Sequence, residues 1–338
     1  PVMAVSSTAI RAGRAFVELF ADDTKLVRGL RRAEARIRAF GDKLKNIGRR
    51  MLTLGMTAAA PLALSTRVFA GFDDQMRAVQ AVIGATGQEF DMLTEKAKYL
   101  GRTTSFSAAQ VAAGMLELGR AGFSPKQIDA AIASVLNLSR ATGTELPEAS
   151  NIAANTLRSF SLEADQMGRV ADVMTATANN SAQTLTDLGE SMKYVAPIAE
   201  EYGLSIEDTA KALGVLANMQ IKGSMAGTSM RMILLKLSDP AIRAQLQGLG
   251  VDLSNFGETM IGVGRAMARM DRPERLAFAK QLFDQRAAGA ALKLAKSDFP
   301  ALSKAIDNAG GTAAETAKEM DAGLGGALRR MLSAAEGA

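Results

Sequence analysis

Apolar residues between Leu26 and Leu54 are spaced alternately by four and three positions, which is the pattern of a coiled-coil seam. The residues just before this pattern, 22–24, are Asp, Asp and Thr, which are types that cap helix N-termini. The pattern predicts a long helix over residues 22–69 whose seam mediates self-association or binds a partner. The seam residues are Leu26, Leu30, Ala33, Ile37, Phe40, Leu44, Ile47, Met51 and Leu54.

Three glycines, Gly41, Gly48 and Gly55, recur at intervals of seven beside this seam. Each costs about 1 kcal/mol of helix propensity relative to alanine, so their recurrence suggests that a second helix backbone packs closely there. The alternative is an ordinary amphipathic helix that folds back on its own domain. Residues 1–21 form an N-terminal arm, in which residues 16–20 (FVELF) are the candidate for a short strand.

Residues 105–216 repeat a unit of helix, turn and helix about every 40 residues. In each turn an apolar residue precedes a polar or acidic first helical turn. These apolar residues, Phe123, Leu162 and Leu204, are 39 and 42 residues apart, which is the length of an antiparallel helical hairpin. We therefore expect residues 70–240 to form a core domain of stacked helical hairpins.

Residue types that begin or end helices divide this region further. The starts are Ser107, Pro147, Thr184–Asp187 and Gly223–Ser224, and the ends are Gly119–Gly122, Gly143, Gly203 and Asp239–Pro240. Residues 241–338 contain frequent glycines, which predict shorter helices in a looser portion that we expect to be truncated.

The composition favours helices and removes most catalytic chemistry. Ala, Leu, Met and Val dominate an apolar fraction of 48%, aromatic residues make up 5%, and there is no tryptophan, so we expect an all-α fold. The chain contains neither histidine nor cysteine, which excludes zinc sites and Ser-His-Asp triads within it. We expect no cofactor, no metal and no enzymatic activity.

Adjacent acidic residues and one serine between glycines are the remaining candidates for catalysis. The acidic pairs at residues 22–23, 73–74 and 200–201 are sequence neighbours, which point about 100° apart on a helix rather than across a cleft. Ser224 has no histidine to activate it and does not stand in the nucleophile-elbow pattern. These features indicate helix caps and solvated faces.

The positive charge is concentrated at the N-terminus. Residues 1–50 contain twelve Lys/Arg and five Asp/Glu, whereas the whole chain carries a net charge of only +5. Such a helix is suited to bind nucleic acid or an acidic protein surface, although no aromatic residues are interleaved for base stacking. Residues 51–66 are uncharged but interrupted by Gly55 and Pro61, which favours a buried or partner-facing helix over a membrane span.

Five segments in order resemble the core region of phage tail tape measure proteins. The most specific is 213–240, where the pattern G-x-x-A-G-T-x-x-R typical of that family is formed by Gly223, Ala226, Gly227, Thr228 and Arg231. The other four segments are residues 70–86, 99–124, 168–205 and 310–337. The resemblance therefore covers roughly residues 70–337, and the basic helix before it is also typical of such proteins.

The resemblance implies a structural virion protein that is made in the host bacterial cytoplasm and occupies the lumen of the tail tube. Such a protein organises tube assembly, helps set tail length and leaves with the DNA. Its expected partners are tail tube and baseplate proteins, tail assembly chaperones and further copies of itself, with transient membrane or DNA contact during ejection. The alternative is a helical adaptor or scaffold whose basic arm binds nucleic acid or an acidic partner.

Two expectations concern length and the motif. Fully helical, 338 residues would extend about 500 Å, but a compact hairpin domain reaches much less, so we expect an N-terminal fragment or a short-tailed relative. Gly223 and Gly227 are four residues apart, so we expect them on one face of a helix with Ala226 alongside, in close helix packing. Arg231 should lie one turn further on and cap a neighbouring helix or pair with an acidic residue.

Overall fold

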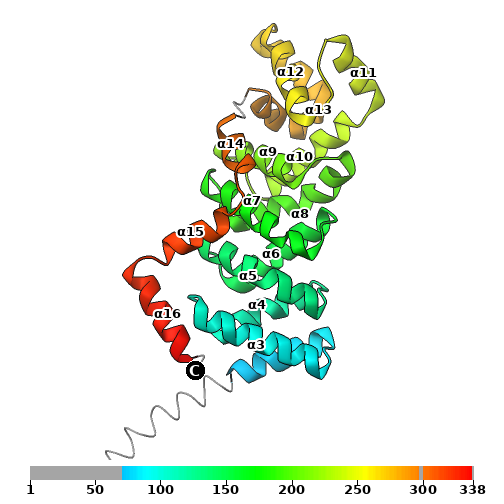
Figure 1. The fold of residues 1–338 in the computed structure, drawn as a ribbon. Coiled ribbons are helices and arrows are strands. Elements are labelled where there is room, and N and C mark those ends of the chain that lie inside the picture. Colours follow the sequence, from blue (N-terminus) through cyan, green and yellow to red (C-terminus); the bar gives the residue numbers. More distant parts are fainter. Residues whose placement is uncertain (1–70, 297–299, 337–338) are drawn as a thin grey trace, which may run out of the picture. The chain divides into compact units, whose positions relative to one another are not determined.

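The computed structural model describes residues 71–296 and 300–336, and every regular element in those residues is a helix (Figure 1). The predicted all-α fold class is confirmed for this part of the chain. The expected arm, strand, basic helix, heptad seam and the glycines Gly41, Gly48 and Gly55 lie outside the described residues.

Fifteen helical elements with defined bounds lie within the described residues, and residues 71–83 before them are also helical. The first nine are α3 (Gly87–Thr103), α4 (Ala108–Arg120), α5 (Pro125–Thr142), α6 (Leu146–Ser159), the 3-10 helix η1 (Ala164–Gln166), α7 (Met167–Asn179), α8 (Leu185–Tyr202), α9 (Ile206–Asn218) and α10 (Ser224–Leu237). The others are α11 (Pro240–Gly248), α12 (Phe256–Ala268), α13 (Arg272–Leu294), α14 (Pro300–Asp307), α15 (Thr312–Met320) and α16 (Leu324–Glu336).

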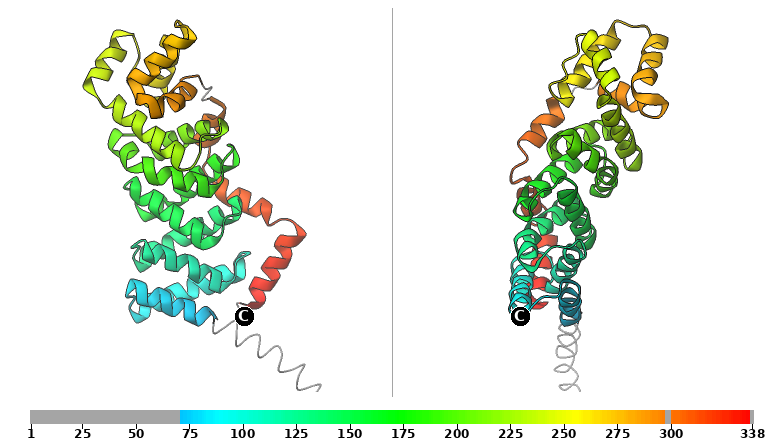
Figure 2. Two further views of the ribbon diagram at one scale, coloured as in Figure 1. Left: turned by 180° about the vertical axis from the view of Figure 1, so that it is seen from behind. Right: turned by 90° about the vertical axis from the view of Figure 1, so that its right-hand side faces the viewer.

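Helices α3 to α10 are arranged in two layers. Helices α4, α6, α8 and α10 pack on one another in that order and form what we call the even layer. Helices α3, α5, α7 and α9 pack likewise and form the odd layer, and consecutive helices connect the two. Figures 1 and 2 show the helices following one another along this stack in sequence order.

The helix starts expected from the sequence are confirmed by the capping geometry. Ser107 and Thr184 are the N-caps of α4 and α8, and each accepts a hydrogen bond from the backbone N–H three residues later. The side chains of Gln110 and Asp187 in turn accept a hydrogen bond from the backbone N–H of the cap residue, which completes a capping box in both helices. Pro147 lies in the first turn of α6, where a missing N–H costs nothing.

The turns that repeat in the sequence share one way of ending a helix. The backbone N–H groups of Phe123, Leu162 and Leu204 donate to the carbonyl oxygens five residues earlier, at 3.1, 3.0 and 2.8 Å. This is the long bond of a Schellman motif, which requires positive φ at the preceding residue. Gly122 and Gly203 supply that φ without strain, and Gly143 likewise ends α5 in the left-handed conformation.

At one of the repeated turns the left-handed residue is not glycine. Ser161, before Leu162, has a φ of +53°. Its side chain is exposed, and no hydrogen bond joins it to another described residue. The turn after α6 therefore ends the helix with the same kind of bond, but Ser161 adopts the positive φ at a steric cost that glycine would avoid.

The described residues form one compact unit. Its core consists mainly of Ala, Leu, Met and Val side chains. Helices α10 and α13 pack together across residue 240, where the sequence placed the start of a looser portion. The longest element of that portion, α13, is interrupted by the non-helical residue Asp284, where φ is +69°, so it consists of two shorter helical segments.

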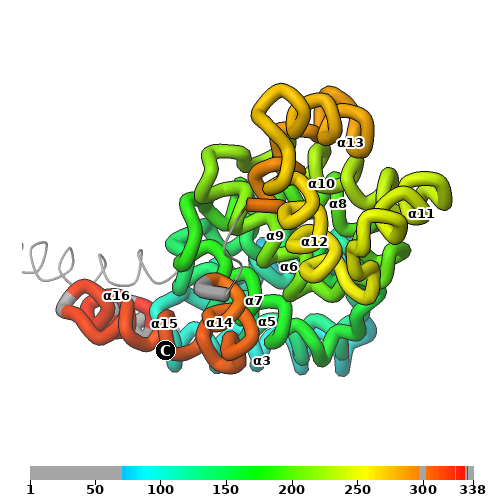
Figure 3. Tube along the Cα trace, turned by 90° about the horizontal axis from the view of Figure 1, so that it is seen from above, coloured from blue at the N-terminus to red at the C-terminus, as the bar shows by residue number. Residues whose placement is uncertain are grey.

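The last three helices, which we call the strap (residues 300–336), run back along the odd layer. Helix α14 packs on α9 and α7, α15 packs on α7 and α5, and α16 packs on α3. Figure 3 shows α14 and α15 beside α7 and α5. At the α14 contact, Leu302 lies against Gly214, where a Cβ atom would stand only 2.5 Å from Leu302 Cδ2.

Polar contacts fix the strap at both ends of α15. The Asp172 carboxylate accepts the backbone N–H groups of Gly311 and Ala313 at 2.8 and 2.9 Å, and so caps the start of this helix from another element. At the other end, Arg140 donates to Asp321 Oδ1 at 2.6 Å and to the Met320 carbonyl at 2.9 Å. The strap is thus held by groups that satisfy the free ends of α15.

Replacing Ser161 by glycine should stabilise the protein by about 0.5–1 kcal/mol, because glycine adopts positive φ without the penalty that serine pays. The matched opposite change is Gly203→Ala, at a φ of +85° and with nothing within 4 Å of the added Cβ. It should destabilise by about 1 kcal/mol through backbone strain alone. Urea unfolding of both variants measures this, and equal effects of one sign would contradict the account.

Asp321→Asn should lower stability at neutral pH by about 1–3 kcal/mol. Burial by itself raises the pKa of Asp321, but hydrogen bonds from Ser105 and Arg140 outweigh it and leave the pKa below its ordinary value of 3.8. A carboxylate with a lowered folded-state pKa stabilises above its unfolded pKa and loses that contribution as the pH falls through the folded value. The difference between variant and parent should therefore persist at pH 5 and shrink below about pH 4.

The control for that experiment is Asp73→Asn, since Asp73 pairs with Arg77 at 2.7 Å on the surface and both side chains are at least 40% exposed. Such exposed pairs contribute little, so the change should leave the stability unaltered at every pH. A pH dependence equal to that of Asp321→Asn would contradict the assigned role of the strap contact.

Candidate interaction surfaces

Helices α8 and α10 approach each other at Gly227. A Cβ atom at Gly227 would overlap the carbonyl oxygen of Ser191 and would stand 3.0 Å from Ser191 Cα. The Ser191 hydroxyl also lies 2.9 Å from the Gly223 carbonyl oxygen, and Lys222 pairs with Asp187 at 3.4 Å. Because contacts advance in the same direction on both helices, α8 and α10 run parallel, and no side chain separates them at this point.

The other motif residues divide between the buried and the exposed side of α10. Ala226 is fully buried. Gly223 differs from the expectation of a shared helix face: it is the N-cap, outside the helix, with φ at +60° and nothing within 4 Å of an added Cβ. Arg231 is exposed, and no hydrogen bond or ion pair joins it to any other described residue, so neither expected role is seen.

Close approach at a small residue recurs along the even layer. At the junction of α4 and α6, a Cβ on Gly114 would stand 3.0 Å from the Leu146 side chain and 3.1 Å from Ser150 Oγ. At the junction of α6 and α8, a Cβ on Gly189 would stand 2.7 Å from Ile152 Cγ2. Gly227 occupies the corresponding place one junction later, so each pair of neighbours in the layer meets at a glycine.

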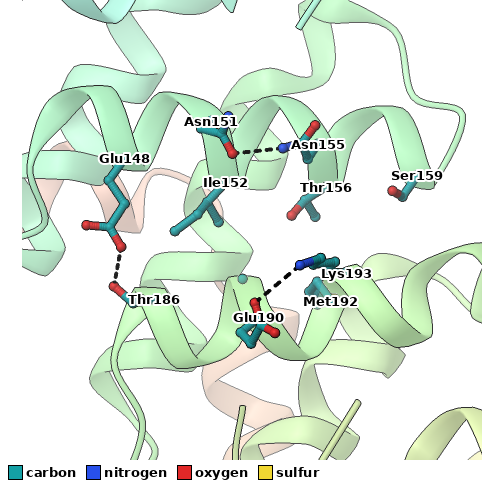
Figure 4. Close-up of a pocket in the computed structure, with 11 residues that line it drawn as sticks. Glu148, Asn151, Ile152, Asn155, Thr156, Ser159, Thr186, Glu190, Met192 and Lys193 are labelled. Carbon is teal, nitrogen blue, oxygen red and sulfur yellow. Dashed lines mark hydrogen bonds and ion pairs between the residues drawn. The ribbon is translucent and has the colours of Figure 1, made fainter. Parts of the chain in front are cut away.

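A groove of about 560 Å³ lies between α6 and α8 (Figure 4). One wall carries the side-chain amides of Asn151 and Asn155, which bond to each other at 2.9 Å. Met192 and Ile152 contribute apolar surface. The groove thus combines polar amides with apolar surface, a combination suited to contact with a peptide chain.

The ionisable groups of this groove already have partners. The Glu148 carboxylate accepts from the Thr186 hydroxyl at 2.7 Å, and Glu190 lies 3.9 Å from Lys193. Across the described ranges, no group of three or more acidic side chains could hold a metal ion. The side chains of the groove are thus engaged mainly with one another.

A second cavity of about 670 Å³ lies where α8 ends near α9, α11 and α12. Burial raises the pKa of Tyr202, which lines it, and a hydrogen bond with Arg243 partly opposes this shift. Lys211, on the same wall, pairs with Asp307 of the strap at 2.6 Å. These contacts join the cavity wall to neighbouring elements and leave no unpaired charge pointing into it.

Comparison with known proteins gives the family. A family model described as "Phage-related minor tail protein" matches residues 94–284, which is more than half of the chain and spans the stack from α3 to α13. The chain belongs to this family. It is 35% identical over 314 residues to the "Tape measure protein" of Pneumococcus phage Dp-1, and 30% identical over 302 residues to the "Probable tape measure protein" of Escherichia phage P2.

These alignments cover most of this chain but little of the relatives. They include 88% and 84% of the chain, yet only 27% and 37% of the respective relatives. The chain thus spans between a quarter and two-fifths of the length of the curated relatives it matches. No solved structure matches it significantly.

Membership of the minor tail family supports a structural role in phage tails. The resemblance drawn from the ordered motifs is thereby confirmed. In the part of the chain that the structure describes, no helix has both the length and the apolar character to cross a membrane.

The sequence did not predict the strap or the groove between α6 and α8. The residues that meet at the strap, such as Arg140 and Asp321, are 181 positions apart, and no local pattern connects them. The groove depends on the spacing between α6 and α8, which are neighbours in space but have α7 between them in the sequence. Only Gly189 could have given a signal for that spacing, since glycine inside a helix is otherwise unfavourable.

Gly227→Ala should destabilise the protein by about 2–4 kcal/mol, because the added methyl group pushes α10 away from the Ser191 backbone. The matched control is Gly289→Ala, at an exposed position inside α13 with nothing within 4 Å of the new Cβ. That change should stabilise by up to about 1 kcal/mol through helix propensity. Thermal unfolding followed by circular dichroism distinguishes the two, and two stabilising changes would refute the close approach.

Proposed function

We propose that this chain is the part of a tape measure protein that occupies the lumen of the tail tube, organises tube assembly and helps set tail length. The main support is its 35% identity, over 88% of its own length, to a protein named as a tape measure protein. The proposal includes the location in the tube lumen, and it includes tube subunits, baseplate proteins and assembly chaperones as partners.

The packing of the described helices favours an organising role over a measuring one. A single helix gains about 1.5 Å of length per residue, whereas helices packed side by side gain only their separation of about 8–10 Å for each helix. Helices α3 to α10 are packed side by side in two layers. We infer that this domain serves as an assembly platform and that length is measured mainly by other parts of a longer protein.

The proposed role needs no catalysis. The absence of histidine and cysteine from the whole sequence removes the usual neutral-pH base and the thiolate nucleophile. We propose a non-enzymatic protein, made in the host cytoplasm and carried in the virion, whose copies self-associate in the tail. Transient contact with membrane or DNA during ejection is part of the same proposal.

A second candidate is a helical adaptor or scaffold whose basic arm binds nucleic acid or an acidic partner. The observation in its favour is the concentration of twelve Lys/Arg within residues 1–50. Gene neighbourhood separates the two candidates, because genes for tube, chaperone and baseplate proteins should flank a tape measure gene.

Deleting the hairpin of α8 and α9 (residues 185–218) in the phage gene tests the proposal. A platform role predicts that few tails assemble and that the remaining tails keep the parental length, because the even layer is interrupted. A measuring role predicts normal numbers of tails that are about 50 Å shorter, at 1.5 Å for each deleted residue.

Electron microscopy of purified tails measures both number and length. The control is Gly289→Ala, at the open position in α13, which should leave both unchanged. Tails of normal number and normal length after the deletion would argue against any organising or measuring role for this domain.

A further inference from the structure

Helix α10 carries motif residues that packing does not explain. Gly227 and Ala226 face the interior, and Gly223 begins the helix with a backbone conformation suited to glycine. Thr228 and Arg231 are exposed. Packing against α8 therefore does not account for these two side chains.

The exposed side of α10 is apolar at the spacing of a helix-packing seam. Met225 is 59% exposed and Leu235 is 44% exposed, although both are large apolar side chains. Thr228 and the half-buried Met232 lie between them, so the four positions follow one another by three, four and three residues. Residues at this spacing form one stripe on a helix, into which the side chains of a second helix can pack.

The junction with α8 determines which way this stripe faces. Gly227 must point at the Ser191 backbone because a side chain of any size is excluded there. Thr228, Met232 and Leu235 lie one, five and eight positions after Gly227, so they are rotated away from that contact toward solvent. The stripe is therefore a fixed feature of the folded domain.

The stripe is flanked by an arginine that has no partner among the described residues. Helix α10 contains no Asp or Glu, and its charged residues are Arg231 and Lys236. Neighbouring cations are already paired, Lys222 with Asp187 and Lys193 with Glu190. Within the described residues, Arg231 has no such partner, so its guanidinium group is available to a carboxylate from outside.

We propose that this face of α10 is a docking surface for an amphipathic helix that carries acidic residues. The apolar side of the incoming helix packs on Met225, Thr228, Met232 and Leu235, and one of its carboxylates binds Arg231. A second copy of the same face does not fit, because it brings another arginine and no carboxylate. The proposal goes beyond the tape measure role, since it specifies the chemistry of one partner.

Two synthetic helical peptides test the proposal with the whole protein. Both carry leucine at the seam positions of three heptads, and one has glutamate at the flanking positions where the other has lysine. Fluorescence anisotropy should show that the glutamate peptide binds about tenfold more tightly than the lysine peptide. Arg231→Glu should reverse this preference, and a Met225→Ser, Leu235→Ser double variant should weaken binding of both peptides about tenfold.

Two controls make the result specific to α10. Met331→Ser removes a side chain that is 62% exposed on α16, beside Arg329 and Arg330, and should leave binding unchanged. Because the altered side chains are exposed, circular dichroism should show unchanged helicity and unfolding temperature for every variant.

Several outcomes would overturn the proposal. These are equal binding of both peptides, no binding of either, loss of binding in Met331→Ser, or retention of glutamate-peptide binding by Arg231→Glu. The last would place the binding on the basic residues 1–50 instead. The binding measurement needs no phage, so its failure is distinct from a failure of the tail-length experiment.

Discussion

Neighbouring helices of the even layer meet at a glycine at each of three successive junctions, and at one of these junctions two backbones come so close that any side chain is excluded. Gly114, Gly189 and Gly227 stand at the three successive junctions, each facing the next or the preceding helix. A glycine within a helix costs about 1 kcal/mol of propensity, which the close contact at that glycine must offset. Gly114 and Gly189 face side chains of α6, whereas Gly227 faces the Ser191 backbone. These short-range contacts set the spacing of the layer, and the backbone contact also fixes the direction in which the outer face of α10 points.

The local features of the fold were readable from the sequence, for physical reasons that act over a few residues. Ser107 and Thr184 start helices because their hydroxyl groups satisfy the free N–H groups of the first turn. Gly143 and Gly203 end helices because they adopt positive φ without strain. Ser161 makes the same kind of turn with a disfavoured residue, and the sequence signal there was the apolar Leu162 that follows it.

The candidate surfaces were less predictable, because they depend on which faces remain uncovered once the layers have formed. The motif was recognisable as a series, but its members turned out to serve different purposes. Gly223 gives a backbone conformation, Gly227 permits contact with α8, and Arg231 points to solvent. A sequence pattern does not separate these purposes, since glycines four residues apart suggest a common face whether or not the helix includes both.

The strap has a consequence for the order in which the protein forms during synthesis. Arg140 and Asp321, which meet at the end of α15, are separated by 181 residues. At about 5–20 residues per second, roughly 10–35 seconds pass between translation of the two. The odd layer is complete only when α9 ends at Asn218, and the 84 residues from there to Leu302 take roughly 4–17 seconds to translate. During that time the outer side of the layer, including the hollow at Gly214 that receives Leu302, is uncovered. The nascent chain thus exposes for many seconds an apolar surface that the finished protein buries.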